Sequence, residues 1–122
     1  ADIAEIIPFF LSHNTIDCTL VCRMAQQASS MVTQSVDAFV RRDVYLARSV
    51  AGQDDLVDED FTAVKQALIA AIAREPGQGE VALDLLMIAK YFERIGDHAV
   101  NLSEWVEFSV TGVHKHDGVE YE

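Results

Sequence analysis

The sequence is poor in the residues that break helices or cross-link chains. Its 122 residues include six glycines, two prolines and two cysteines. Because proline and glycine disfavour helix most strongly, their scarcity favours helix over sheet. Hydrophobic residues make up 50% of the chain, which excludes a disordered protein. The length allows one domain with a single core.

The two cysteines, Cys18 and Cys22, stand four residues apart on a predicted helix. That number excludes a disulfide framework, and no second ligand pair at a zinc-like spacing accompanies them. We expect two reduced structural thiols, as is typical of a cytosolic protein.

Basic residues are also scarce, with nine against twenty acidic ones and a formal net charge of −11. This charge argues against nucleic acid or an anionic membrane as the main partner. It favours cations or a basic patch on another protein, although an acidic surface that only confers solubility remains an alternative. The longest apolar runs, residues 6–11 and 68–73, are far shorter than the roughly 20 residues of a membrane span, so we expect no membrane insertion.

Several catalytic signatures are absent. The sequence has no glycine-rich phosphate loop and no nucleophile elbow. None of the four histidines follows an acidic residue by three positions, which excludes the Glu-x-x-His pairs of di-iron carboxylate bundles.

What is present is helical periodicity. Apolar residues recur every three or four positions over residues 14–42, 43–74 and about 80–110. We expect Gly52 to lie inside the second helix at a cost of about 1 kcal/mol. The predicted fold is all-α, an antiparallel up-down-up three-helix bundle with a short apolar N-terminal lead-in.

The predicted helix ends define three segments. Asn14 and Asp43 are expected N-caps, with Asp17 in the first helical turn, and Gly112 is the expected left-handed cap of the third helix. Residues 1–13 form a lead-in or a linker from a preceding domain, residues 14–113 form the bundle, and residues 114–122 form a polar, frayed tail.

The third helix has two faces. At about 100° per residue, one stripe is apolar and must face a core. A second stripe, about 170° away, is acidic and polar. The apolar stripe contains Leu85, Ile88, Phe92, Ile95, Ala99, Leu102 and Val106, and the second contains Glu93, Asp97, Asn101 and Glu104.

Two acidic pairs have the i, i+4 spacing that makes side chains neighbours on a helix: Asp54 with Asp58, and Glu93 with Asp97. Like charges at this spacing repel, so the pairs call for a cation unless solvent screens them. If the second and third helices pack side by side, four carboxylates converge on one groove. Oxygen ligands suit Mg²⁺, Ca²⁺, Mn²⁺ or iron.

The alternative is a solvated acidic face that Lys90 and Arg94 screen. In the metal-binding interpretation, two further residues of the third helix extend the groove, Asn101 and Glu104.

Residues 91–101, Tyr-Phe-Glu-Arg-Ile-Gly-Asp-His-Ala-Val-Asn, resemble the signature of the PhoU family, regulators of bacterial phosphate uptake and signalling. Residues 42–48, Arg-Asp-Val-Tyr-Leu-Ala-Arg, and residues 54–58, Asp-Asp-Leu-Val-Asp, are similar to the family as well. The spacing between the blocks also matches, and the similarity covers roughly residues 15 to 113.

The resemblance implies a three-helix bundle whose paired acidic motifs hold metal in some members. The expected cofactor is a divalent or polynuclear metal: iron, zinc, manganese or magnesium. The implied ligand positions and their neighbours are Asp54, Asp58, Glu93, Asp97, Asn101 and Glu104.

The resemblance also implies a non-enzymatic, cytoplasmic regulator. It would restrain phosphate transport and the phosphate regulon by contacting the ATPase of a phosphate ABC transporter and a sensor histidine kinase. The alternative is a metal-storage or metal-dependent hydrolytic domain. Family members typically carry two bundles in tandem, so this single bundle looks like a C-terminal half or a domain from another architecture, with apolar surface that we expect to pair as a homodimer.

Overall fold

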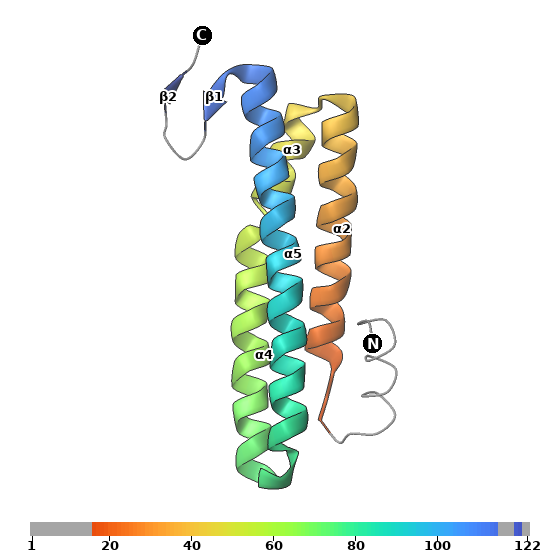
Figure 1. Ribbon diagram of the computed structural model, residues 1–122, viewed down its shortest axis with the longest axis vertical. Helices are drawn as coiled ribbons and strands as arrows, with labels where there is room; N and C mark the ends of the chain where they lie inside the picture. Colours follow the sequence, from red (N-terminus) through yellow and green to blue (C-terminus); the bar gives the residue numbers. More distant parts are fainter. Residues whose placement is uncertain (1–15, 115–118, 121–122) are drawn as a thin grey trace.

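The computed structural model describes residues 16–114 and 119–120, which form a bundle of long helices (Figure 1). Its helices are α2 (Thr19–Arg41), α3 (Val44–Ala51), α4 (Asp54–Arg74) and α5 (Gly79–Thr111), with the short 3₁₀ helix η1 (Pro76–Gln78) before α5. α2 and α5 run in the same direction, and α3 followed by α4 makes the returning arm. The predicted all-α, up-down-up bundle is confirmed, while the predicted lead-in at residues 1–13 lies outside the described residues.

The core lies along α5, which packs against α2, α3 and α4. Most of the apolar stripe predicted on this helix is buried, and Ile95 and Leu102 are half-buried. The buried members of the stripe are Leu85, Ile88, Phe92, Ala99 and Val106. The largest fully buried side chains of the other helices are Met24, Met31, Val50, Val57 and Val64.

The second helix is not continuous, contrary to the sequence-based prediction. α3 ends at Ala51, and α4 begins at Asp54 after Gly52 and Gln53. Glycine weakens a helix by about 1 kcal/mol relative to alanine. Here tertiary hydrogen bonds add to that effect, because the Gln53 side chain bonds to glutamines of α2. The break is therefore anchored to the neighbouring helix.

The α2–α3 turn follows the predicted capping chemistry. Arg42 adopts a left-handed conformation at φ 53°, which reverses the chain after α2. The Asp43 side chain accepts a hydrogen bond of 3.0 Å from the Leu46 amide, so its predicted N-cap role is confirmed. The turn sets α3 antiparallel to α2.

The outer ends of the bundle agree less fully with the prediction. Asn14, the expected N-cap of α2, lies outside the described residues, and α2 begins only at Thr19. Asp17 precedes this helix instead of lying in its first turn, and its Oδ1 accepts hydrogen bonds from the Thr19 amide and hydroxyl. Gly112, at φ 77°, caps α5 as predicted.

Beyond Gly112 the chain forms a pairing that the sequence pattern did not indicate. The two-residue strands β1 (Val113–His114) and β2 (Val119–Glu120) pair antiparallel. No helix in the described part of the chain combines the length and hydrophobicity needed to cross a bilayer.

Candidate functional site: an acidic groove between α4 and α5

Three carboxylates from two helices converge between α4 and α5, in a cluster that we call the acidic groove. Asp54 and Asp58 come from α4, and Asp97 comes from α5. Each offers one oxygen to a group whose members all lie within 4.8 Å of one another. The structure thus brings one predicted i, i+4 pair together with a member of the other.

A close approach of α4 and α5 places these side chains. A Cβ atom on Gly96 would lie 3.5 Å from both methyl groups of Val57 and 3.8 Å from the Met31 sulfur. Gly96 and Val57 immediately precede Asp97 and Asp58 in the sequence. The residue without a side chain therefore brings the two backbones close where the carboxylates follow.

The helix break places the third carboxylate. Gln53 is the N-cap residue of α4, and its carbonyl accepts a hydrogen bond of 3.1 Å from the Leu56 amide. Gln27 Nε2 donates to Gln53 Oε1 at 2.7 Å, and Gln53 Nε2 donates to Gln34 Oε1 at 3.0 Å. These bonds to α2 hold the first turn of α4, and with it Asp54.

Burial and neighbouring charge both disfavour ionisation of Asp54. Desolvation raises the pKa of Asp54, and the charge of Asp97 raises it further. A side-chain hydrogen bond with Asp97 and the charges of Asp55 and Glu93 act in the same direction. Asp54 Oδ1 is buried, and none of the residues that the structure describes donates a hydrogen bond to it. A carboxylate oxygen in this state is suited to a cation.

Asp58 is shifted in the same direction. Desolvation raises the pKa of Asp58, followed by the charges of Asp54, Glu93 and Asp55, whereas the charge of Lys90 lowers it. The carboxylates of the groove therefore repel one another, as their spacing predicts.

The other predicted residues lie along the same side of the site but outside the three-carboxylate group. Glu93 forms an ion pair with Lys90, with Glu93 Oε1 2.6 Å from Lys90 Nζ. Asn101 is exposed and Glu104 half-buried, about one and two helical turns beyond Asp97. They continue the polar stripe of α5 and do not belong to the three-carboxylate group.

The donor set fits a hard cation. The group contains only carboxylate oxygens, which suit Mg²⁺, Mn²⁺, Ca²⁺ or iron, and it lacks the nitrogen and sulfur ligands typical of structural zinc. Its unpartnered buried oxygen and its mutual repulsion are both relieved by a bound positive charge. The residues present therefore fit a metal ion.

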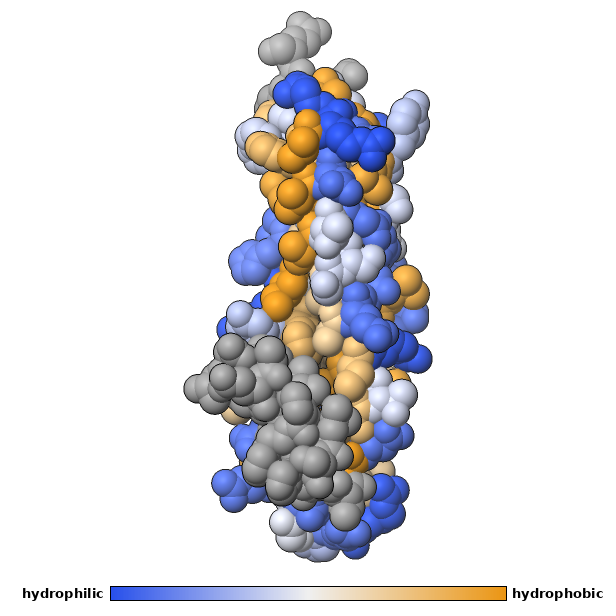
Figure 2. All heavy atoms as spheres, turned by 90° about the vertical axis from the view of Figure 1, so that its right-hand side faces the viewer, coloured by the Kyte–Doolittle hydropathy of each residue, from blue (hydrophilic) through white to orange (hydrophobic). Residues whose placement is uncertain are grey.

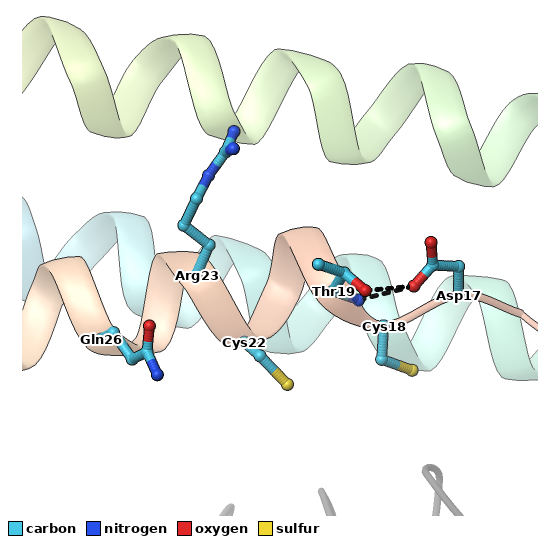
Figure 3. A pocket seen from close by; sticks show the side chains of 6 residues that line it. All are labelled: Asp17, Cys18, Thr19, Cys22, Arg23 and Gln26. Carbon is cyan, nitrogen blue, oxygen red and sulfur yellow. Dashed lines mark hydrogen bonds between the residues drawn. The ribbon is translucent and has the colours of Figure 1, made fainter.

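A separate hollow lies beside the start of α2, with a volume of about 430 Å³. Figure 3 shows that Cys22 and Gln26 point to one side of α2, while Arg23 points to the other side, toward α4, where it pairs with Asp60. Neither cysteine forms a disulfide, as predicted, and the buried Cys18 donates a hydrogen bond from its Sγ to the Ile16 carbonyl. Hydrogen bonds from Thr19 lower the pKa of Asp17 at this hollow and keep its carboxylate engaged.

Sequence reasoning missed two polar features. One is the anchoring role of Gln53, whose partners are 26 and 19 residues away in the chain. The other is Glu107, a buried carboxylate whose Oε1 accepts from Arg48 Nε at 2.9 Å. One sequence signal could have indicated this buried polar region. Ser103 is a polar residue at a core-facing spacing on α5, and it is fully buried one turn before Glu107.

The raised pKa of Asp54 predicts a pH-dependent effect of its neutralisation. An acid whose pKa is raised by folding destabilises the folded state at pH 7, and this cost disappears as the pH falls through the folded and then the unfolded pKa. We expect Asp54→Asn to stabilise the metal-free protein at pH 7 by about 0.5 kcal/mol, on the scale of a relieved like-charge pair. The gain should shrink as the pH falls and vanish near pH 3, below the unfolded pKa of about 3.9, where the carboxyl is protonated in both the folded and the unfolded state.

Urea unfolding in a chelator at several pH values measures this difference, and Asp84→Asn, at an exposed position of α5, is the control. A gain from Asp54→Asn that stays constant between pH 7 and pH 3 would contradict the assignment.

Comparison with known proteins identifies the family. The family model for the PhoU domain matches residues 21–106, which include both helices of the acidic groove. A protein of Caulobacter vibrioides (strain NA1000 / CB15N) is 33% identical over 90 residues, covering 74% of this chain and 39% of that protein. Proteins of Zymomonas mobilis and Pseudomonas aeruginosa are 37% identical over 89 residues and 35% identical over 92 residues.

These two matches cover 73% and 75% of this chain and 38% of each relative. All three relatives are named phosphate-specific transport system accessory protein PhoU homolog. The chain spans about two fifths of the length of the relatives it matches. It belongs to the PhoU family, and residues 21–106 are its PhoU domain.

Proposed function

We propose that this chain is a non-enzymatic regulatory domain of phosphate transport. It acts in the cytoplasm by contacting the ATPase of a phosphate ABC transporter and a sensor histidine kinase, and it restrains the phosphate regulon. The observation that carries the proposal is the PhoU-domain match over residues 21–106. The names of the relatives, accessory proteins of phosphate-specific transport, support it.

The chemistry of the groove favours this function over a hydrolytic one. A metal-dependent hydrolase commonly places a general base beside the metal ligands, to take the proton of the attacking water. In the described part of the chain, the converging group consists of carboxylates alone, and the ammonium group of Lys90 is paired with Glu93. Storage or hydrolysis by the same carboxylates is the alternative, and it has less support.

We also propose that a metal ion modulates the regulator at the acidic groove. Asp54, Asp58 and Asp97 would hold it, and the oxygen-only set favours manganese, magnesium or iron over zinc. A bound cation would cancel the repulsion between α4 and α5 and so stiffen the surface that a partner meets. Residues adjoining this proposed site are Glu93, Asn101 and Glu104.

Metal titration tests the groove. We expect Mn²⁺ to bind the purified chain and Asp58→Asn or Asp97→Asn to weaken binding about tenfold or more, because loss of outer-shell partners alone typically costs 10–100-fold. Isothermal titration calorimetry and elemental analysis measure this, with Asp84→Asn on the exposed side of α5 as the matched control. Equal Mn²⁺ affinity in all four proteins would exclude the site.

Gene removal tests the regulatory role. We expect a strain that lacks the whole gene to signal phosphate starvation constitutively in high phosphate, as measured with a phosphate-regulated reporter. Complementation with the intact gene should restore repression, and a copy carrying Asp97→Asn should restore it only in part if metal contributes. Unchanged reporter output after deletion would contradict the proposal, and full repression by the Asp97→Asn copy would separate regulation from metal binding.

We further propose that two copies of the chain pair through the outer face of α2. Before Arg41 this helix carries only two charged residues, Arg23 and Asp37, in a chain of net charge −11. Val36 and Val40 are 46% and 71% exposed. Figure 2 faces this side of the molecule and shows hydrophobic surface along its upper half.

Charge explains why this face suits self-association. Two copies of so acidic a chain repel each other unless they meet where charges are absent. Phe39, half exposed on the same helix, lies 6.2 Å from the Trp105 ring of α5 between centroids. This pair extends the apolar surface from α2 onto α5, and aromatic residues are enriched in interfaces.

A charge placed on α2 tests the pairing. We expect Val36→Asp to weaken dimerisation tenfold or more, because it would bury an unpaired carboxylate in the interface. Ile69→Asp, at a 59% exposed position of α4, should leave dimerisation unchanged. Sedimentation equilibrium measures both variants. A monomeric parent at all concentrations, or equal effects of the two substitutions, would exclude this interface.

A further inference from the structure

Lys90, on α5, contacts both a carboxylate beside the acidic groove and an aromatic ring of α4. Its Nζ is 2.6 Å from Glu93 Oε1, one turn along α5. The same atom lies 5.2 Å from the centroid of the Phe61 ring on α4, within the range of a cation–π interaction. Two contacts on two helices thus fix the ammonium group at the rim of the groove.

We propose that Lys90 is a built-in counter-cation that sets the affinity of the groove for divalent ions. It does so by offsetting part of the charge of Glu93, the fourth predicted carboxylate of the groove. The inference rests on the proposed metal site and adds a residue to it that determines affinity.

The contacts of Glu93 support this role. The Glu93 side chain is only 13% exposed, whereas that of Lys90 is 51% exposed. Water therefore screens Glu93 poorly, and its charge needs a partner from the protein. The Lys90 ammonium supplies that partner, so it offsets part of the negative charge that Glu93 contributes to a cation bound by Asp54, Asp58 and Asp97.

Lys90 also acts on the α4 carboxylates. Its charge opposes the repulsion that Asp58 receives from the other acids of the groove. The ammonium and a divalent ion are thus alternative sources of positive charge for one set of carboxylates. With Lys90 removed, a divalent ion would face all four carboxylates without a competitor. At separations of about 6 Å and a solvent-like dielectric, losing one positive charge should strengthen divalent binding on the order of tenfold.

The test compares Lys90→Gln with a matched loss of charge elsewhere. Lys65→Gln removes an exposed lysine of α4, about two helical turns beyond Asp58. Mn²⁺ titration should give a dissociation constant on the order of tenfold lower for Lys90→Gln than for the parent. Lys65→Gln should change it far less. Equal effects of the two substitutions would show that Lys90 acts only through the net charge of the protein, and would overturn the proposal.

A second comparison introduces Glu93→Gln into the parent and into the Lys90→Gln variant. With Lys90 present, this change should alter Mn²⁺ affinity about threefold or less, because Lys90 offsets part of the Glu93 charge. With Lys90→Gln, it should remove most of the gain. Equal effects in the two backgrounds would overturn the pairing. In chelator, the urea midpoint should fall for Lys90→Gln and return when Glu93→Gln is added.

The outcomes separate this proposal from the metal site itself. If the parent binds Mn²⁺ and Lys90→Gln leaves its affinity unchanged, only the role of Lys90 is wrong. If neither the parent nor any variant binds Mn²⁺, the proposed metal site is wrong and the affinity role of Lys90 is excluded with it.

Discussion

The close contact between α4 and α5 governs both the core and the groove. A Cβ atom on Gly96 would lie 3.5–3.8 Å from side-chain atoms of Val57 and Met31. A side chain larger than that of alanine would therefore force the helices apart. Asp58 and Asp97 each follow a residue of this contact. The distance between the acidic side chains is therefore set by apolar packing beneath them, and the groove cannot widen without opening the core.

The break between α3 and α4 adds a second constraint to the same groove. It makes Asp54 the first residue of a helix, where the positive end of the helix dipole favours a negative charge. Burial and the neighbouring acids oppose ionisation more strongly, since the pKa of Asp54 is raised. Gln53, bonded to Gln27 and Gln34, holds this unfavourable arrangement in place from α2. Three helices thus cooperate to position one carboxylate.

Much of this architecture was predictable from local patterns. Periodicity gave the three-helix bundle and the buried side of α5, and the caps at Asp43 and Gly112 depend only on neighbouring residues. The break at Gly52 was not predictable, because a single glycine is tolerated inside many helices and the bonds of Gln53 are long-range. The spacing of Lys90 and Glu93 is visible in the sequence. Their engagement depends also on Phe61, which only the packing of α4 on α5 brings near.

The treatment of acidic residues elsewhere in the bundle supports the interpretation of the groove as functional. Within the described residues, Asp60 pairs with Arg23 and the buried Glu107 pairs with Arg48. Asp54, Asp58 and Asp97 instead converge on one another. Stability alone would disfavour this arrangement, because each carboxylate raises the cost of ionising the next. A cluster of like charges that lowers stability is therefore expected to serve a function at the place where it lies.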